Sequence, residues 1–232
     1  MEKVPGKRIL PLILVMAVLC ARPALGGALM DEHGRLFTAY FSAKIQAASI
    51  LPVLTGDEED LRSGRVPNLT LCVEKAAVEG VVYETLLIVL EDVFFSTDAR
   101  GIHVHSFKTA RVTGTLGKKD FLQSLNRNMP HFAVSELDLK DGTVTVKGVY
   151  EKKLMFKVRA LMRFTGKYVV EKSGAAKIRF DESSNDNAMV SARDVGRAVA
   201  NASPAINFQK FFVRPAVEEV RVDHDMVWFS AR

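Results

Sequence analysis

Alternating apolar and polar positions run through most of the chain from residue 68 onward and predict β-strands. Residues 69–73 (LTLCV) alternate with a period of two, which is typical of a half-buried strand. Residues 81–95 (VVYETLLIVLEDVFF) are nearly continuously apolar. This run predicts a strand buried on both faces or a strand with a bulge, and a helix is the alternative.

Turn residues divide the later part of the chain into hairpins. Asp141-Gly142 lies between two alternating runs, which is the strongest short-range signal for a hairpin. Residues 154–164 alternate again, residues 172–175 (KSGA) predict a second turn, and His224-Asp225 predicts a third near the C-terminus. The pattern favours an α+β protein built on a twisted, largely antiparallel sheet.

Three segments have helical spacing. Residues 29–51 repeat apolar side chains every three to four positions, and Pro52 is expected to end that helix. A short amphipathic helix is predicted after Gly117, and another after Ser191, with an inner side formed by Val195, Ala198 and Val199. Residues 55–67 (TGDEEDLRSGRVP) are charged and predict a mobile loop or linker.

The N-terminus has the three-part layout of a secretory signal peptide. Basic residues precede an apolar run at 9–20, and the small-x-small site Ala24-Leu25-Gly26 follows. An uncleaved anchor helix is the alternative, although the run is short for a bilayer, which takes about 20 residues to span. Cleavage after Gly26 predicts an exported protein, periplasmic or extracellular. The expected divisions are a signal peptide (1–26), an N-terminal helix with a charged loop (27–67) and a β-rich domain (68–232).

Removal of the leader changes what charge and cysteine content imply. The leader holds four basic residues and one acid, so three of the five net positive charges leave with it. The remaining balance gives no argument for a nucleic-acid partner. Cys72 is then the one cysteine left, which predicts a buried small side chain and no internal disulfide.

Motifs for catalysis and cofactors are missing, so the sequence predicts a non-enzymatic protein without cofactor or metal. It holds no nucleophile elbow, no phosphate-binding loop and no dinucleotide fingerprint. His103 and His105 share one face of a strand and could reach one metal ion with His131 or His224; two solvent-facing histidines are the alternative. The acids Glu91-Asp92, and Asp181-Glu182 with Asp186, lie at expected strand ends, where acids are ordinary.

The apolar content of the strands suggests a cavity for acyl chains, with an ordinary two-sided core as the alternative. Such a pocket needs apolar walls and few polar groups. The expected wall residues are Phe156, Val158, Met162 and Phe164, on one face of the 154–164 strand. On the other face, Lys157, Arg159 and Arg163 either meet anionic headgroups at a membrane surface or form a solvated strand face.

Several segments between Leu69 and Phe229 carry a family resemblance. They are the strand with Cys72, the 78–95 strand region, residues 108–112 (KTARV) leading into 117–122 (GKKDFL), the hairpin at 137–148 (LDLKDGTVTVKG) and the closing hairpin at 215–228 (PAVEEVRVDHDMVW). In this order they resemble the bacterial LmeA-like phospholipid-binding family. The resemblance implies an exported envelope protein with a sheet wrapped around helices, similar to tubular lipid-binding folds. It supplies no motif of binding residues.

Three function classes follow from these expectations. The first is an exported protein of the cell envelope that binds phospholipid or another acyl lipid against an apolar sheet face. The second is an envelope structural or assembly factor with an ordinary packed core and a protein partner at a sheet edge. The third is a hydrolase or metal enzyme that uses the acids or the histidines.

Overall fold

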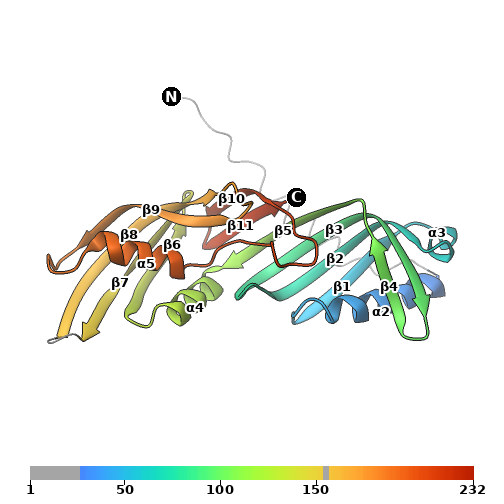
Figure 1. Cartoon of the computed structure of the whole chain (residues 1–232), viewed down its shortest axis with the longest axis horizontal. Helices are drawn as coiled ribbons and strands as arrows, with labels where there is room; N and C mark the ends of the chain where they lie inside the picture. Colours follow the sequence, from blue (N-terminus) through green and yellow to red (C-terminus); the bar gives the residue numbers. More distant parts are fainter. Residues whose placement is uncertain (1–26, 154–156) are drawn as a thin grey trace, which may run out of the picture.

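The computed structural model describes residues 27–153 and 157–232 and shows two antiparallel sheets side by side along the long axis of the molecule (Figure 1). The seven-stranded sheet A has the order β1-β2-β3-β5-β11-β10, with β4 also paired to β3, and the four-stranded sheet B has the order β6-β7-β8-β9. The expected α+β class is therefore confirmed. None of the described helices is long and apolar enough to cross a membrane. The strands of sheet A are β1 (Ser49–Thr55), β2 (Arg65–Val78), β3 (Val81–Asp98), β4 (Gly101–Ser106), β5 (Thr109–Gly117), β10 (Val217–Asp223) and β11 (Met226–Ala231); those of sheet B are β6 (Phe132–Lys140), β7 (Thr143–Lys153), β8 (Lys157–Val170) and β9 (Ala176–Asn185).

The first helix, α2 (Ala28–Ser42), covers one face of sheet A (Figure 1). Phe37 and Phe41 are fully buried, and the Phe37 ring packs edge-on against Phe95 of β3 at 5.3 Å between ring centroids. The prediction of a helix over 29–51 is wrong after Ser42: residues 43–48 form a turn and an isolated bridge to β2, and residues 49–51 begin β1. Pro52 lies inside β1, where it is tolerated because β1 is an edge strand.

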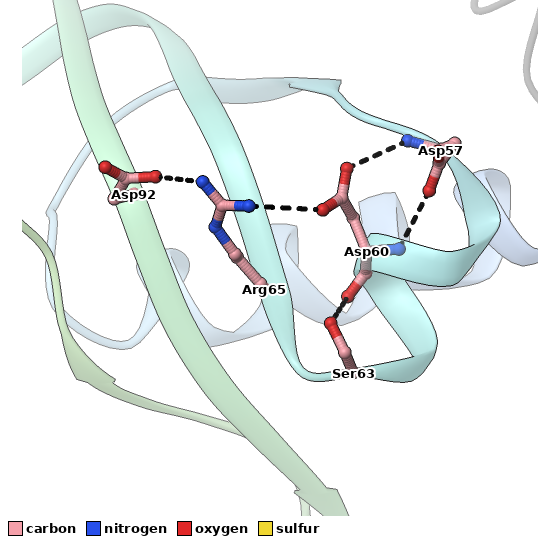
Figure 2. Close-up of polar contacts among 5 residues, drawn as sticks. All are labelled: Asp57, Asp60, Ser63, Arg65 and Asp92. Atoms are coloured by element: carbon pink, nitrogen blue, oxygen red, sulfur yellow. Dashed lines mark hydrogen bonds and ion pairs between the residues drawn. The ribbon is translucent and has the colours of Figure 1, made fainter.

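The charged segment 55–67 is ordered, contrary to the prediction of a loop or linker. It contains α3 (Glu58–Arg62), which starts with a reciprocal capping box between Asp57 and Asp60 (Figure 2). Arg65 then contacts Asp60 at 3.5 Å and Asp92 of β3 at 2.6 Å, and Ser63 donates to the Asp60 carbonyl. The acids that resembled a solvated linker are used in capping and in pairing to the sheet.

Sheet B is a meander of hairpins with α4 (Lys118–Asn128) and α5 (Ala192–Ala202) beside it (Figure 1). The predicted Asp141-Gly142 turn is confirmed, and both residues have positive φ, 52° and 76°. The predicted hairpins at 172–175 and 224–225 are also confirmed. Each depends on local turn chemistry, which explains why the sequence showed them.

The β10–β11 hairpin joins the two sheets. It belongs to sheet A through β11 and β5, while Gly142 of the β6–β7 turn donates to the Val222 carbonyl at 2.8 Å. Lys75 of β2 adds a second link, because its ammonium contacts Glu84 at 2.5 Å and Asp120 of α4 at 3.1 Å. The elements around sheet B are thereby fastened to sheet A.

Cys72 differs from its expected state. It is nearly buried on β2, as predicted, but it is disulfide-bonded. The prediction of an unpaired Cys72 is therefore wrong.

Candidate functional site

A groove with a volume of about 670 Å³ lies between α5 and the edge strand β9. Volumes of about 300–1,000 Å³ are typical of sites that take small organic ligands. The lining residues come from the end of β8, from β9 and from one face of α5: Phe164, Val169, Glu171, Lys177, Ile178, Arg179, Phe180, Asp181, Ser183, Ala192, Arg193, Gly196, Arg197, Ala200 and Asn201.

The floor of the groove contains buried apolar side chains, and small residues of α5 allow the helix to pack closely against them. Phe164 and Ile178 are buried, and Phe180 is half-buried with its ring 5.6 Å from that of Phe164. A Cβ atom on Gly196 would stand 3.0 Å from Cε1 of Phe164, so glycine allows the helix to lie directly on this ring. Ala200, one turn further on, lines the same side of the helix.

The position of α5 follows from its sequence. Ser191 caps the helix, because its hydroxyl accepts a hydrogen bond from the backbone N–H of Asp194 at 3.3 Å. Val195 and Val199 are buried on the inner side as predicted, but Ala198 is exposed, so its assignment to the inner side is wrong. The buried side is instead continued by Gly196 and Ala202.

The rim of the groove is cationic. Lys177 contacts Glu171 at 3.1 Å, and Arg179 contacts Asp181 at 3.4 Å, so these two cations have acidic partners. The remaining rim cations, Arg193 and Arg197, stand on successive turns of α5 and are exposed. Their guanidinium groups make no hydrogen bond or ion pair within the described part of the chain. Two guanidinium groups with free donors are therefore available to an anion at the rim.

The predicted wall residues lie on one inward face of β8, as far as the structure describes them. Val158, Met162 and Phe164 are 8%, 3% and 0% exposed, so their inward orientation is confirmed. Phe156 lies outside the described residues. Phe164 lies under the groove, whereas Val158 and Met162 are not among its lining residues and pack in the closed core. Contact of any of them with lipid stays a prediction.

Sequence reasoning missed the arginines of α5. Arg193 and Arg197 look like the solvated side of an amphipathic helix when they are considered alone. The available signal was their spacing of four beside Ala192, Gly196 and Ala200, which places both cations along a strip of small residues. Only the packing of α5 against β9 turns that strip into the wall of a groove.

The expected metal and acid–base candidates do not form a cluster. His103 and His105 are exposed on β4 and contact Asp98 at 3.2 Å and Ser96 at 2.9 Å. Within residues 27–153 and 157–232, no group of three or more His, Cys, Asp or Glu side chains could hold a metal ion.

The acids at the predicted strand ends make structural pairs. Glu91 accepts hydrogen bonds from Thr109 at 2.7 Å and Arg111 at 3.3 Å. The Arg65 guanidinium bound to Asp92 lowers the pKa of that carboxyl. Asp92 is therefore an ionised partner of Arg65 at neutral pH rather than a proton donor.

A second, smaller hollow of about 130 Å³ lies beside α2, between Tyr40, Lys44, His105 and Phe212. The Lys44 ammonium lies 4.8 Å from the centre of the Tyr40 ring, in a cation–π contact. The hollow lies well below the volume range of ordinary ligand sites, so the groove at α5 is the better candidate.

Comparison with known proteins gives no relative: no protein-family profile, no curated protein and no solved structure matches this chain. The resemblance to the LmeA-like family stays a prediction. The geometry of the groove therefore has to carry the functional argument.

Proposed function

We propose that this protein is an exported, non-enzymatic protein of the cell envelope that binds phospholipid or another anionic acyl lipid in the groove between α5 and β9. An acyl chain lies against the partly exposed side chains of Val169, Phe180 and Ala200, while the side chains of Phe164 and Ile178 are buried in the wall of the groove. The guanidinium groups of Arg193 and Arg197 bind the phosphate of the headgroup. The observation that carries the proposal is a groove of mixed apolar and polar lining whose rim holds two arginines that have no acidic partner among the described residues.

The proposal differs from the sequence-based expectation in where the lipid lies. The inward face of β8 is closed, so the acyl chain occupies the adjoining groove rather than a tunnel through the core. The proposal includes a likeness to tubular lipid-binding folds, in which a sheet wraps around helices, and this part of it is based on the family resemblance alone. Export rests on the leader at 1–26, and sequencing the N-terminus of the exported protein tests it, with residue 27 as the expected start.

The alternative, an assembly factor that binds a protein through a sheet edge, has one supporting observation. The edge strand β1 exposes 47% of Leu51. Pro52 removes a backbone donor from the same strand, which weakens it as a template for an added strand. The weak edge at β1 therefore favours the lipid-binding proposal over binding of a protein through this strand.

Blocking the groove tests the proposal. Ala200→Trp places an indole in the groove, whereas Ala198→Trp places the same group on the exposed side of α5. Binding of a fluorescent phosphatidylglycerol is measured by titration, with thermal melting on the same samples. We expect Ala200→Trp to abolish binding and Ala198→Trp to leave it unchanged. Equal binding by the two folded variants would contradict the proposed site.

Headgroup recognition is tested by Arg193→Gln/Arg197→Gln. We expect the affinity for phosphatidylglycerol to fall at least about tenfold, which corresponds to about 1.4 kcal/mol. Uptake of an uncharged diacylglycerol probe should change little, because it has no phosphate to lose. Equal losses for both lipids would show that the arginines act on the shape of the groove rather than on the headgroup.

A further inference from the structure

The outward face of β8 carries a row of cations around an exposed leucine. Alternate residues of a strand point to the same side, so Arg159, Leu161, Arg163, Thr165 and Lys167 share this face. Leu161 is 56% exposed, and the three cations are exposed as well. No ion pair or side-chain hydrogen bond of these three cations is found within the described residues. Across the ladders, Glu151 stands opposite Arg159 and Glu182 opposite Thr165, and Glu136, paired with Lys147, lies near enough to Arg163 to interact with its charge; no acid lies in the row itself.

A second exposed apolar side chain lies in a loop that is attached to β8. Met189, in the loop before α5, is 71% exposed. This loop is fastened to β8: the Leu161 N–H donates to the Asp186 carboxylate at 2.7 Å, and the Asn187 amide donates to the Arg159 carbonyl at 2.9 Å. A single exposed apolar residue is ordinary on a protein surface. Two of them on connected segments, beside cations that make no ion pair among the described residues, indicate a contact surface.

The cationic row also reaches the groove. Lys167 stands directly opposite Arg179 in the ladder of β8 and β9, and Arg179 lines the groove. The outward face of sheet B is therefore connected through β9 to the rim that holds Arg193 and Arg197, with Arg179 itself paired to Asp181. A surface of this kind complements an anionic bilayer, in which apolar side chains enter the interface and basic side chains meet the headgroups.

We infer that the face of sheet B formed by Arg159, Leu161, Arg163 and Lys167, with the attached loop that carries Met189, docks onto an anionic lipid bilayer. Docking places the rim of the groove at the headgroup layer, from which a lipid molecule can enter. The inference rests on the proposed function only in stating why the protein docks, namely to take up a lipid. The attachment itself follows from charge and exposure on this face.

Vesicle co-sedimentation tests the inference. Vesicles of phosphatidylcholine alone are compared with vesicles of equal parts phosphatidylcholine and phosphatidylglycerol. The test variant is Arg159→Gln/Arg163→Gln. The matched control is Arg35→Gln/Arg100→Gln, which removes the same charge from exposed positions on α2 and beside β4. A basic residue near an anionic surface contributes about 1 kcal/mol, so we expect about a thirtyfold loss of partitioning in the test variant.

The unaltered protein should bind the anionic vesicles, bind more weakly in high salt, and bind phosphatidylcholine vesicles poorly. The control should behave like the unaltered protein. If the test and control variants partition equally, or if the unaltered protein does not bind anionic vesicles, the inference is overturned. If the unaltered protein does not bind anionic vesicles, a protein partner becomes the alternative occupant of this face.

The groove variant separates docking from lipid uptake. Ala200→Trp should still sediment with anionic vesicles although it no longer takes up fluorescent lipid. Docking without any uptake by the unaltered protein would contradict the proposed function and leave the docking inference standing. Lipid uptake without docking would contradict the docking inference and leave the proposed function standing.

Discussion

The contact between Gly196 of α5 and Phe164 of β8 makes a quantitative prediction about the floor of the groove. Alanine is favoured over glycine in a helix interior by about 1 kcal/mol, so Gly196→Ala would ordinarily stabilise the protein. Here the new Cβ would stand 3.0 Å from Cε1 of Phe164. The ring cannot easily give way, because it is fully buried between Phe132 and Phe180 at centroid distances of 5.9 and 5.6 Å. Overpacking of this kind costs about 1–3 kcal/mol, so we expect Gly196→Ala to destabilise the protein by about 1 kcal/mol.

A double-mutant cycle with Phe164→Leu isolates this contact. Leucine lacks the ring atom that meets the new methyl group, so Gly196→Ala should stabilise the Phe164→Leu background by about 1 kcal/mol. The expected coupling energy is thus about 2 kcal/mol. Urea unfolding of the four proteins measures it, and the cost of Phe164→Leu itself cancels in the cycle. A coupling energy near zero would show that α5 does not rest on Phe164 and would refute the geometry of the groove.

Three further predictions concern polar groups that support the fold. Tyr168→Phe should lower the free energy of unfolding by about 1–3 kcal/mol, because the Tyr168 hydroxyl donates to the Pro204 carbonyl at 2.9 Å. Tyr83→Phe should leave stability unchanged or raise it, because the buried Tyr83 hydroxyl has no well-formed hydrogen bond within the described residues. Thermal melting of both variants compares the two effects. Lys75 lowers the pKa of Glu84 below its ordinary value of 4.5, so the stability lost in Lys75→Gln should be full at neutral pH and vanish as the pH falls through the lowered pKa; a loss independent of pH would exclude the ion pair. Asp57→Ala should cost about 1 kcal/mol by urea unfolding, whereas no change would show that the capping box does not stabilise α3.

The parts of the fold that could be predicted from sequence are those set by local chemistry. Asp141-Gly142 predicts its turn because few residue pairs adopt positive φ at both positions. The inward face of β8 could be predicted because a strand that is half buried repeats every two residues. The 81–95 run is a strand, and its second face is half-buried rather than buried.

The errors arise where tertiary contacts decide between local alternatives. Residues 49–51 were included in the helical spacing, yet they belong to β1, which pairs with residues 68–74 of β2. Residues 58–62 looked like part of a solvated linker because the local pattern does not show that Arg65 joins Asp60 of this segment to Asp92 of β3. The groove was invisible for the same reason, since it exists only where α5 meets the edge of β9.

Native mass spectrometry of the gently purified protein, before and after incubation with phosphatidylglycerol liposomes, tests the central claim most directly. The account predicts a folded protein that carries one acyl lipid per chain, retains it in Ala198→Trp and lacks it in Ala200→Trp. Protein that is consistently free of lipid, and that takes none from the liposomes, would contradict lipid binding in the groove.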